Sequence, residues 1–250
     1  MTNATNVTKQ SLNIATEDGT ARASLFVPTT PNAARSAVLL YMDGIGFRPA
    51  LDGMAERFAN EGYTVLLPDL FYRGGLYDPI DAKTAFVNND SKVRIMGLIR
   101  ATTQGMTRRD GRTFLSELDD AGANGPIGVV GYCMGGARAL HAAAAFPHRI
   151  RAVASFHGGG LASGAPDSPH LVAADIKARA YVGSAGVDGS FPPEQSARLA
   201  ESLRRAEVDH VIENYIGMQH GWTIPDHSEF NAVGAERHWK RVLTLFAEAL

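Results

Sequence analysis

Residues 127–136 read IGVVGYCMGG, and helix-forming residues follow from Ala137 onward. The apolar first half predicts a buried strand and the alanine-rich continuation predicts a helix, so a sharp turn must join them. At that turn Gly131 and Gly135 flank Cys133 at positions −2 and +2, the G-x-S-x-G spacing of a nucleophile elbow with sulfur in place of oxygen. Glycine is required there because a β-carbon beside the strained nucleophile would collide with the neighbouring strand or helix.

Apolar runs alternate with longer helical patterns on both sides of this stretch. Runs that are apolar on both faces suit the buried strands of a parallel sheet, and the alternation predicts an α/β fold with helices on both faces of the sheet. We expect strands at residues 37–41, 64–67, 127–130, 152–155, 178–182 and 211–215. We expect helices at residues 49–60, 92–118, 137–146, 193–206 and 235–249.

The chain begins with a hairpin pattern. Strand-like runs at residues 12–15 and 21–27 flank Glu17-Asp18-Gly19, and Asp-Gly between two such runs is a hairpin signal, so an antiparallel edge should start the sheet. Residues 158–169, rich in Pro, Gly and Ser, are expected to form a surface loop because the alternation resumes after them. With no internal repeat and no linker, residues 1–250 are expected to form a single domain.

Composition excludes several classes of protein. The 250 residues include 24 Lys+Arg and 26 Asp+Glu, and the resulting net charge of −2 predicts no nucleic-acid partner and no anionic membrane partner. A hydrophobic fraction of 45% argues against disorder and fibrous structure. One cysteine forms neither an intramolecular disulfide nor a multi-thiolate metal site, which favours a reducing, cytoplasmic location. Residues 1–10 are polar and lack the apolar core of a signal peptide.

A thiol nucleophile in an acyl-transfer enzyme needs a base. All eight histidines follow Cys133, so chain order alone does not choose among them. His220 follows directly after the strand expected at 211–215, at the carboxyl edge where the sites of such sheets assemble. His238, by contrast, falls inside the last expected helix. We therefore predict that His220 is the base.

The base needs an orienting acid, which in this class of sheet comes between the nucleophile and the histidine in the chain. Asp188 lies in the loop after the strand expected at 178–182, from which its carboxylate reaches the far ring nitrogen of the base. Asp209 and Glu213 compete as acids, but the first precedes a strand and the second lies within one. The alternative interpretation of Asp188 is a polar turn residue. We predict that Asp188 is the acid.

Together the motifs identify a family. From about residue 37 to the end, the chain resembles the dienelactone hydrolases of the α/β-hydrolase superfamily. The matching stretches are residues 41–44 (YMDG), 67–73 (LPDLFYR), 131–136 (GYCMGG), Asp188 with Phe191 and Pro193 following, and 220–222 (HGW). The resemblance implies an α/β-hydrolase fold and a Cys133–Asp188–His220 triad. It also implies hydrolysis of a small lactone or ester by a monomer or small homo-oligomer, with no cofactor and no metal.

The resemblance further implies an oxyanion hole and a group that activates the thiol. The oxyanion donors should be the backbone N–H groups of Met134, directly after the nucleophile, and of Gly44. Asp43 stands where the family has a glutamate that helps to generate the thiolate, although it is one methylene shorter. The alternative interpretation of Asp43 is a residue that ends a strand and turns the chain.

Substrate-binding residues are also implied. Arg73 matches a family arginine that contacts the substrate carboxylate, and we expect Tyr72 beside it and Trp222 to line the substrate site. Ile224 replaces the second arginine of the family, which lies four residues after the catalytic histidine. This departure predicts a weaker preference for carboxylate-bearing substrates. The alternative interpretation of Arg73 is an exposed arginine without a role.

Two other functions remain open. The first keeps the same residues but acts on a non-lactone ester or a thioester. The second is a non-hydrolytic binding or redox-sensing protein in which Cys133 is an oxidisable thiol. Residues 157–160 (HGGG) are similar to a lipase oxyanion motif, but they lie downstream of the nucleophile and are interpreted as a loop. Residues 44–46 (GIG) match the start of the G-x-G-x-x-G pattern of dinucleotide-binding sites. Pro49 stands at the position of the third glycine, so no such site is predicted.

Overall fold

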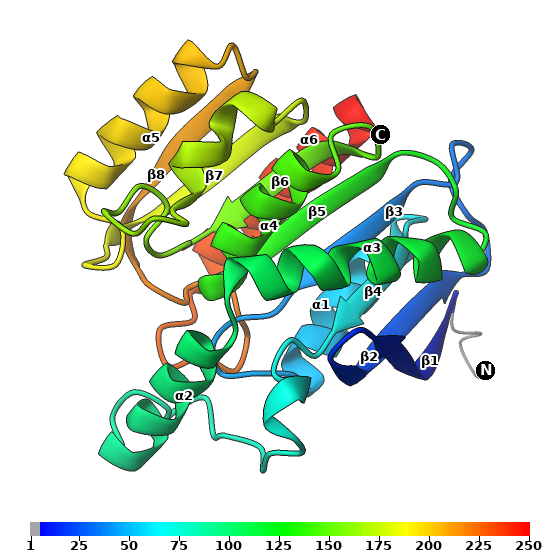
Figure 1. The fold of residues 1–250 in the computed structure, drawn as a ribbon, viewed down its shortest axis with the longest axis horizontal. Coiled ribbons are helices and arrows are strands. Elements are labelled where there is room, and N and C mark those ends of the chain that lie inside the picture. The colour runs from blue at the N-terminus through cyan, green and yellow to red at the C-terminus, as the bar shows by residue number, and fades with distance from the viewer. Residues whose placement is uncertain (1–5) are drawn as a thin grey trace.

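Eight strands form one sheet in the computed structural model, which describes residues 6–250 (Figure 1). Their order across the sheet is β1-β2-β4-β3-β5-β6-β7-β8. The six strands from β3 to β8 run parallel, β2 pairs antiparallel with β4, and β1 pairs antiparallel with β2. The strands are β1 (Val7–Thr16), β2 (Gly19–Pro28), β3 (Ala37–Tyr41), β4 (Thr64–Pro68), β5 (Ile127–Tyr132), β6 (Ile150–Phe156), β7 (Arg179–Val187) and β8 (His210–Gln219). The predicted α/β fold with a mostly parallel sheet is confirmed.

The central strands are apolar on both faces, as the sequence predicts. Every residue of β3, β4 and β5 is buried, because helices cover both sides of the sheet at these positions. The edge strand β8 consists of partly buried and exposed residues except for the buried Tyr215. The core of the molecule therefore lies around β3 and β5, and the nucleophile elbow follows directly from β5.

The predicted N-terminal hairpin is also confirmed. Strands β1 and β2 pair from Val7 opposite Pro28 to Thr16 opposite Gly19, so the turn is made by Glu17 and Asp18. Part of the polar segment 1–10 that argues against a signal peptide lies outside the described residues. Because β2 continues to pair with β4, the hairpin extends the parallel sheet by two antiparallel strands.

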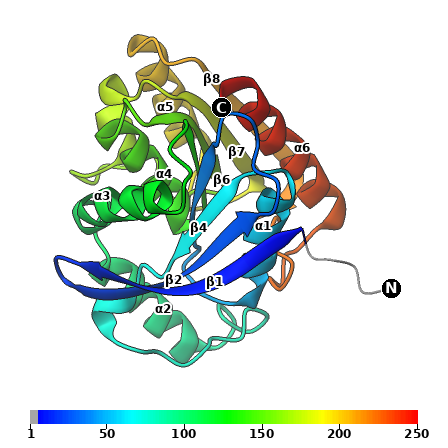
Figure 2. The ribbon, with the colours of Figure 1, turned by 90° about the vertical axis from the view of Figure 1, so that its right-hand side faces the viewer.

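Helices cover the sheet in two groups. Helices α1 and α6 lie on one face, where Phe58 and Trp239 are in contact with ring centroids 4.7 Å apart, and α3, α4 and α5 lie on the other face (Figure 2). The helices are α1 (Pro49–Asn60), α2 (Asn89–Ala101), α3 (Gln104–Asp120), α4 (Met134–Ala145), α5 (Pro193–Arg205) and α6 (Ala232–Ala249), with short 3₁₀ helices η1 (Tyr72–Gly74) and η2 (Pro169–Asp175). No helix among residues 6–250 combines the length and apolar character needed to cross a membrane.

The single helix expected at residues 92–118 is wrong, because two helices occupy this part of the chain. Thr102 has extended angles of φ −105° and ψ 92°, which end α2. The side chain of Thr103 then accepts a hydrogen bond from the N–H of Met106 at 3.2 Å and caps the start of α3. The capping bond stabilises a break that no glycine or proline marks in the sequence.

Residues 76–101, called here the outer segment, include α2 and lie at the periphery of the molecule (Figure 1). The buried residues of the outer segment belong to a small hydrophobic cluster that is separate from the main core, while Tyr77, Leu98 and Ile99 also pack against that core. The members of this outer cluster are Ile45, Ile80, Ala82, Ala85 and Ile95, with Ile99 packed against them. The outer segment therefore has its own packing contacts, and only Ile45 of the outer cluster belongs to the loop after β3.

Candidate active site

Cys133 lies between β5 and α4 in a strained backbone conformation. Its angles are φ 54° and ψ −120°, a region that residues with side chains rarely adopt. A β-carbon at Gly131 would lie 1.9 Å from the carbonyl oxygen of Gly135. One at Gly135 would lie 2.5 Å from the carbonyl oxygens of Tyr41 and Met42. The glycines are therefore needed for the close approach of α4 to β5 and β3, as the elbow pattern predicts.

Asp188 and His220 meet at the carboxyl edge of the sheet, following β7 and β8 respectively. The Nδ1 atom of His220 lies 2.7 Å from Oδ2 of Asp188. The other carboxylate oxygen, Oδ1, accepts hydrogen bonds from the N–H of Ser190 at 2.8 Å and from its hydroxyl at 2.6 Å. Because both oxygens have partners, the carboxylate is held in place and directs the ring of His220.

The electrostatics of this pair favour a charged imidazole. Burial lowers the pKa of His220, but the charge of Cys133 and hydrogen bonds with Asp188 and Cys133 outweigh it and raise the pKa to about 10. Burial raises the pKa of Asp188, but its hydrogen bonds with His220 and Ser190 and the charge of His220 outweigh this effect, so the pKa is lower than its ordinary value. With this raised pKa the imidazole is protonated at neutral pH, beside the carboxylate of Asp188.

His157 is a site residue that the sequence analysis missed, since residues 157–160 were interpreted only as a loop. Its Nδ1 accepts a hydrogen bond from the backbone N–H of Cys133 at 3.1 Å, and its Nε2 lies 2.8 Å from the hydroxyl of Thr223. Full burial lowers the pKa of His157 well below its ordinary value, with further lowering by the charge of nearby His220. The ring is therefore neutral, with the proton on Nε2. Its position directly after β6, at the same sheet edge, was the signal available in the sequence.

The two predicted oxyanion donors both border the thiol. Met134 is the first residue of α4, so its N–H has no acceptor within the helix. Gly44, in the loop after β3, lines a small recess together with Cys133 and His220. Among the described residues, no backbone hydrogen bond outside the helices and strands uses the N–H of Gly44. A β-carbon at Gly44 would lie 2.6 Å from Cδ1 of Ile99.

Asp43 lines the same recess, but its carboxylate is bonded to an arginine. Arg48 donates to Oδ1 of Asp43 at 2.6 Å and to Oδ2 at 2.9 Å, and the N–H of Ile45 also donates to Oδ1. Arg48 in turn bonds both oxygens of Asp226, at 2.8 and 3.0 Å. The sequence analysis missed Arg48. The arginine joins the loop after β3 to the loop that follows His220.

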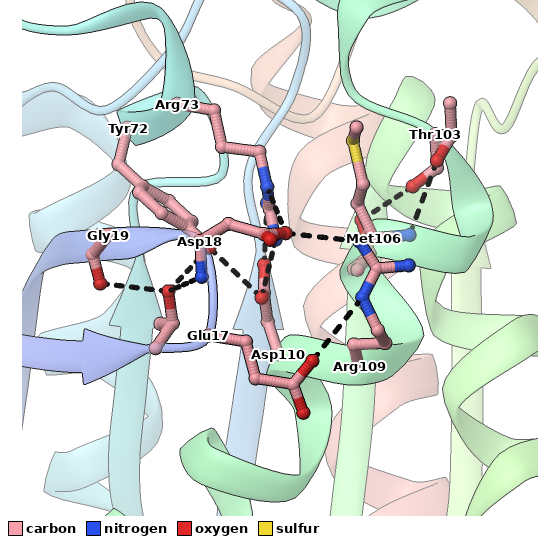
Figure 3. A network of polar contacts seen from close by, with 11 residues as sticks. Glu17, Asp18, Gly19, Tyr72, Arg73, Thr103, Met106, Arg109 and Asp110 are labelled. Carbon is pink, nitrogen blue, oxygen red and sulfur yellow. Dashed lines mark hydrogen bonds and ion pairs between the residues drawn. The ribbon is translucent and has the colours of Figure 1, made fainter.

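Arg73 and Tyr72 do not line the pocket or the recess at Cys133, and they take part in a separate polar network (Figure 3). The Nε and Nη2 atoms of Arg73 donate to Asp18 at 2.9 and 2.7 Å. Its Nη1 and Nη2 atoms donate to Asp110 at 2.8 and 2.7 Å. The hydroxyl of Tyr72 donates to the same Asp110 at 3.0 Å and is 2.7 Å from the hydroxyl of Thr16. The guanidinium group of Arg73 is therefore already paired with two carboxylates of the same chain.

Trp222 and Ile224 likewise do not line the pocket or the recess at Cys133. Both side chains are 0% exposed and belong to the main core. The indole of Trp222 packs against Tyr215, with ring centroids 4.8 Å apart, and against His157 at 5.2 Å. The segment after His220 turns inward and fills the core, because its apolar side chains are more stable there than at the edge of a pocket.

A pocket of about 630 Å³ opens at the thiol. It contains Cys133, Met134, Asp188 and His220. The remaining lining residues are Phe86, Val87, Met96, Ile99, Gly159, Gly160, Val187, Gly189, Ser190, Gln219, His227, Ser228 and Glu229. The outer segment thus forms one wall of this pocket. Within residues 6–250, no group of three or more His, Cys, Asp or Glu side chains is arranged to hold a metal ion.

Comparison with known proteins gives a consistent picture. The sequence model of the dienelactone hydrolase family matches residues 22–250. A carboxymethylenebutenolidase from Rhodococcus opacus is 29% identical over 221 residues, which cover 85% of this chain and 81% of that protein. Protein usf from Aquifex pyrophilus is 25% identical over 230 residues, which cover 88% of this chain and 91% of that protein.

Solved structures share the fold over nearly the whole chain. A protein from Klebsiella pneumoniae has a TM-score of 0.80 at 21% identity and covers 96% of this chain and 98% of its own. A dienelactone hydrolase-like promiscuous phosphotriesterase from metagenomic libraries has a TM-score of 0.76 at 21% identity, covering 98% and 99%. At these identities the likeness concerns the fold alone, and it confirms the predicted α/β-hydrolase architecture.

Proposed function

Because the chain belongs to the dienelactone hydrolase family, and is thus a hydrolase of esters or lactones, we propose that Cys133 is its nucleophile. In this proposal His220 transfers the proton and Asp188 orients its ring. The observation that carries the proposal is the 2.7 Å contact between His220 and Asp188 beside the thiol of a strained elbow. A residue at such a turn carries strain that needs a compensating use, and nucleophilic catalysis is one.

The first half of the reaction forms a thioester. The Cys133 thiolate attacks the ester carbonyl carbon, and the carbonyl oxygen becomes an oxyanion held by the N–H groups of Met134 and Gly44. When the C–O bond breaks, the imidazolium of His220 donates its proton to the leaving oxygen. In a lactone that oxygen stays attached to the acyl group through the opened ring. The pKa of His220, raised to about 10, supports a protonated imidazole beside Cys133 as the starting state.

The second half releases the acid. Neutral His220 takes a proton from water, and the resulting hydroxide attacks the thioester carbonyl. The C–S bond then breaks, the thiolate leaves, and the imidazolium is restored beside it. Throughout, the bond from Nδ1 to Asp188 keeps the other ring nitrogen directed at the reacting atoms. The same steps act on a lactone, an open-chain ester or a thioester.

The thiol-activating role of Asp43 stays a prediction. Its two oxygens bond Arg48, so the carboxylate takes up the thiol proton only after at least one of these bonds is released. A carboxylate held in this way adds negative charge beside the thiolate, which Arg48 offsets.

Substitution of the nucleophile tests the proposal. Cys133→Ala should abolish hydrolysis of p-nitrophenyl acetate while leaving the circular dichroism spectrum unchanged, and iodoacetamide should inactivate the wild-type protein. His148→Ala, at an exposed position, serves as the control and should keep full activity. If Cys133→Ala retains more than a few per cent of the rate, the proposal fails. A redox sensor without hydrolytic function would show no such rate in the wild-type protein.

A pair of variants tests the relay behind the thiol. His220→Ala should lower kcat by on the order of 10³-fold or more, and Asp188→Asn somewhat less, because members of a triad act as a unit. The double variant should be hardly slower than His220→Ala alone. Fully additive losses would mean that the two residues do not serve one proton transfer.

A further inference from the structure

The pocket at Cys133 has an unusual distribution of apolar and charged side chains. Phe86, Val87, Met96 and Ile99 of the outer segment form one apolar wall, and Val187, the last residue of β7, lines the pocket as well. Val87 is 84% exposed and Val187 is 65% exposed, although both are apolar. A bound apolar substituent would remove these side chains from water, which is the driving force expected for binding here.

The lining of this pocket includes no lysine or arginine. The guanidinium groups of two other arginines already have carboxylate partners within the protein. Arg48 is paired with Asp43 and Asp226, and Arg73 is paired with Asp18 and Asp110. Within this lining, an anionic substituent on a substrate would therefore contact no cationic side chain other than His220, whose charge Asp188 offsets.

The pocket does contain a second carboxylate. Asp188 is paired with His220, whereas Glu229 has no cationic partner in the described part of the chain. The neighbouring His227 accepts a hydrogen bond at Nδ1 from the N–H of Glu229 at 3.1 Å. Burial lowers the pKa of His227. Asp43 and Glu229 raise this pKa while His220 and Arg48 lower it, and the net shift is downward, so the ring is neutral near pH 7. The remaining polar lining residues, Ser190, Gln219 and Ser228, are uncharged.

We propose that the pocket selects uncharged esters or lactones with an apolar acyl group, and that Glu229 is the specificity-determining residue that rejects substrates with a free carboxylate. This inference rests on the proposed function, because it assumes that the pocket beside Cys133 receives the substrate. It also replaces the reason first given for a weak carboxylate preference, since Ile224 is buried and Glu229 lines the pocket.

A matched pair of substrates tests the role of charge. The p-nitrophenyl monoester of adipic acid carries a distal carboxylate, and its methyl ester is neutral and of similar length. We expect kcat/KM of the wild-type enzyme to be roughly tenfold or more higher for the methyl ester, since like charges in one pocket repel. Glu229→Gln should narrow this ratio and Glu229→Arg should abolish or invert it, mainly by accelerating the free acid.

A control variant separates a local effect from the net charge. Glu56→Arg makes the same charge change at an exposed position on α1 that does not line the pocket, and it should leave the ratio as in the wild type. A wild-type preference for the free acid, or a ratio that does not respond to Glu229→Arg, would overturn the inference.

Alkylation of the thiol tests the inference without turnover. Iodoacetamide is neutral and iodoacetate is anionic, and the intrinsic ratio of their rates is measured on free N-acetylcysteine. Relative to that reference, Cys133 should react preferentially with iodoacetamide, and Glu229→Arg should remove the preference. Turnover that persists in Cys133→Ala contradicts the proposed function alone, whereas an unselective alkylation ratio contradicts the role of Glu229 alone.

A series of acyl chains tests the apolar wall. Going from p-nitrophenyl acetate to butanoate and hexanoate, kcat/KM should rise by up to about fourfold per methylene group. Phe86→Ser should flatten the series without altering the ratio between the two adipate esters. A rate that falls steadily with chain length in the wild-type enzyme would contradict an apolar acyl site.

Discussion

Cys133 and His157 both have positive φ angles, 54° and 40°, at the ends of neighbouring strands. Each is a non-glycine residue in a region that costs free energy, and the hydrogen bond from the N–H of Cys133 to Nδ1 of His157 joins them. The bond needs an unprotonated nitrogen, which burial of His157 provides. The orientation of the thiol is therefore set by backbone geometry and by a neutral histidine, before any substrate binds.

The pKa of His220 leads to a prediction for stability. Its folded-state pKa, about 10, exceeds its ordinary value of 6.5, so folding binds the proton more tightly and the stabilisation is fully present below pH 6.5. It is lost as the pH rises toward 10. The difference in unfolding free energy between the wild type and His220→Gln should therefore be larger at pH 6 than at pH 10, as measured by urea unfolding.

A matched histidine gives the control for this prediction. His148 is exposed, and His148→Gln should show no such decrease between the two pH values. A difference for His220→Gln that grows with pH would contradict the assigned direction of the shift.

The structure brings some of the predicted site residues together and places others elsewhere, for physical reasons. Cys133, Asp188 and His220 each follow a recognisable strand, so the topology of a parallel sheet brings them to one edge. Arg73 also follows a strand, but its partner Asp110 lies on α3 and is far away in the chain. Whether a guanidinium faces a substrate or an internal carboxylate depends on such long-range contacts, which local patterns do not contain.

At the scale of elements, the glycines of two helices provide a contrast. Gly135 lies in the first turn of α4 against the carbonyl oxygens of Tyr41 and Met42, whereas a β-carbon at Gly53 in α1 would have no atom within 4 Å. Gly53→Ala should raise the unfolding free energy by about 0.5–1 kcal/mol, because glycine is unfavourable inside a helix. Gly135→Ala should be strongly destabilising and should abolish activity. Thermal unfolding and the ester assay measure both.

One result for these two glycine variants would contradict the role given to Gly135. If Gly135→Ala were as stable and active as Gly53→Ala, the close contact between α4 and β3 would not be required for the elbow.

The helices also show where sequence patterns suffice for predicting structure. For α1 both predicted boundaries are correct, because Pro49 starts the helix and an amphipathic repeat follows it. The boundary between α2 and α3 was missed, since the Thr102–Thr103 break lies within a continuous helical pattern. Threonine is common inside helices as well, and only the capping bond with Met106 identifies its role here.

Arg48 links two of the loops that carry the site. It is buried between Asp43, which is also buried, and Asp226. Arg48→Met should reduce the unfolding free energy by about 3–5 kcal/mol, because it leaves the Asp43 carboxylate buried without a partner. Adding Asp43→Asn should recover part of the loss, and denaturant unfolding of the two variants measures this. An equal loss of unfolding free energy in the single and double variants would show that the destabilisation does not come from the unpaired Asp43 carboxylate.

At the scale of the whole molecule, the network around Arg73 joins distant segments. Asp18 lies in the β1–β2 turn, Arg73 in η1 and Asp110 in α3, and the guanidinium bonds both carboxylates (Figure 3). Arg109 of α3 also contacts Asp18 at 3.0 Å. The N-terminal hairpin is thereby attached to a helix that covers the parallel part of the sheet.

This network predicts a separation of stability from catalysis. Asp110→Ala should lower the unfolding free energy by about 1.5–3 kcal/mol, because Arg73 keeps only Asp18 as a partner and the hydroxyl of Tyr72 loses its acceptor. The kcat/KM for p-nitrophenyl acetate should be unchanged at temperatures where the variant is folded. A selective loss of activity on carboxylate-bearing esters would instead restore Arg73 as a substrate-binding residue.

The outer segment separates the choice of substrate from the chemistry performed on it. Its buried residues form a hydrophobic cluster of their own, and Tyr77, Leu98 and Ile99 also pack against the main core, from whose strands Cys133, Asp188 and His220 extend. Phe86 and Met96 can therefore be substituted, in natural or laboratory evolution, without destabilising the sheet that carries Cys133. New substrate ranges are thus accessible through few substitutions, and libraries for directed evolution of this chain belong in residues 76–101.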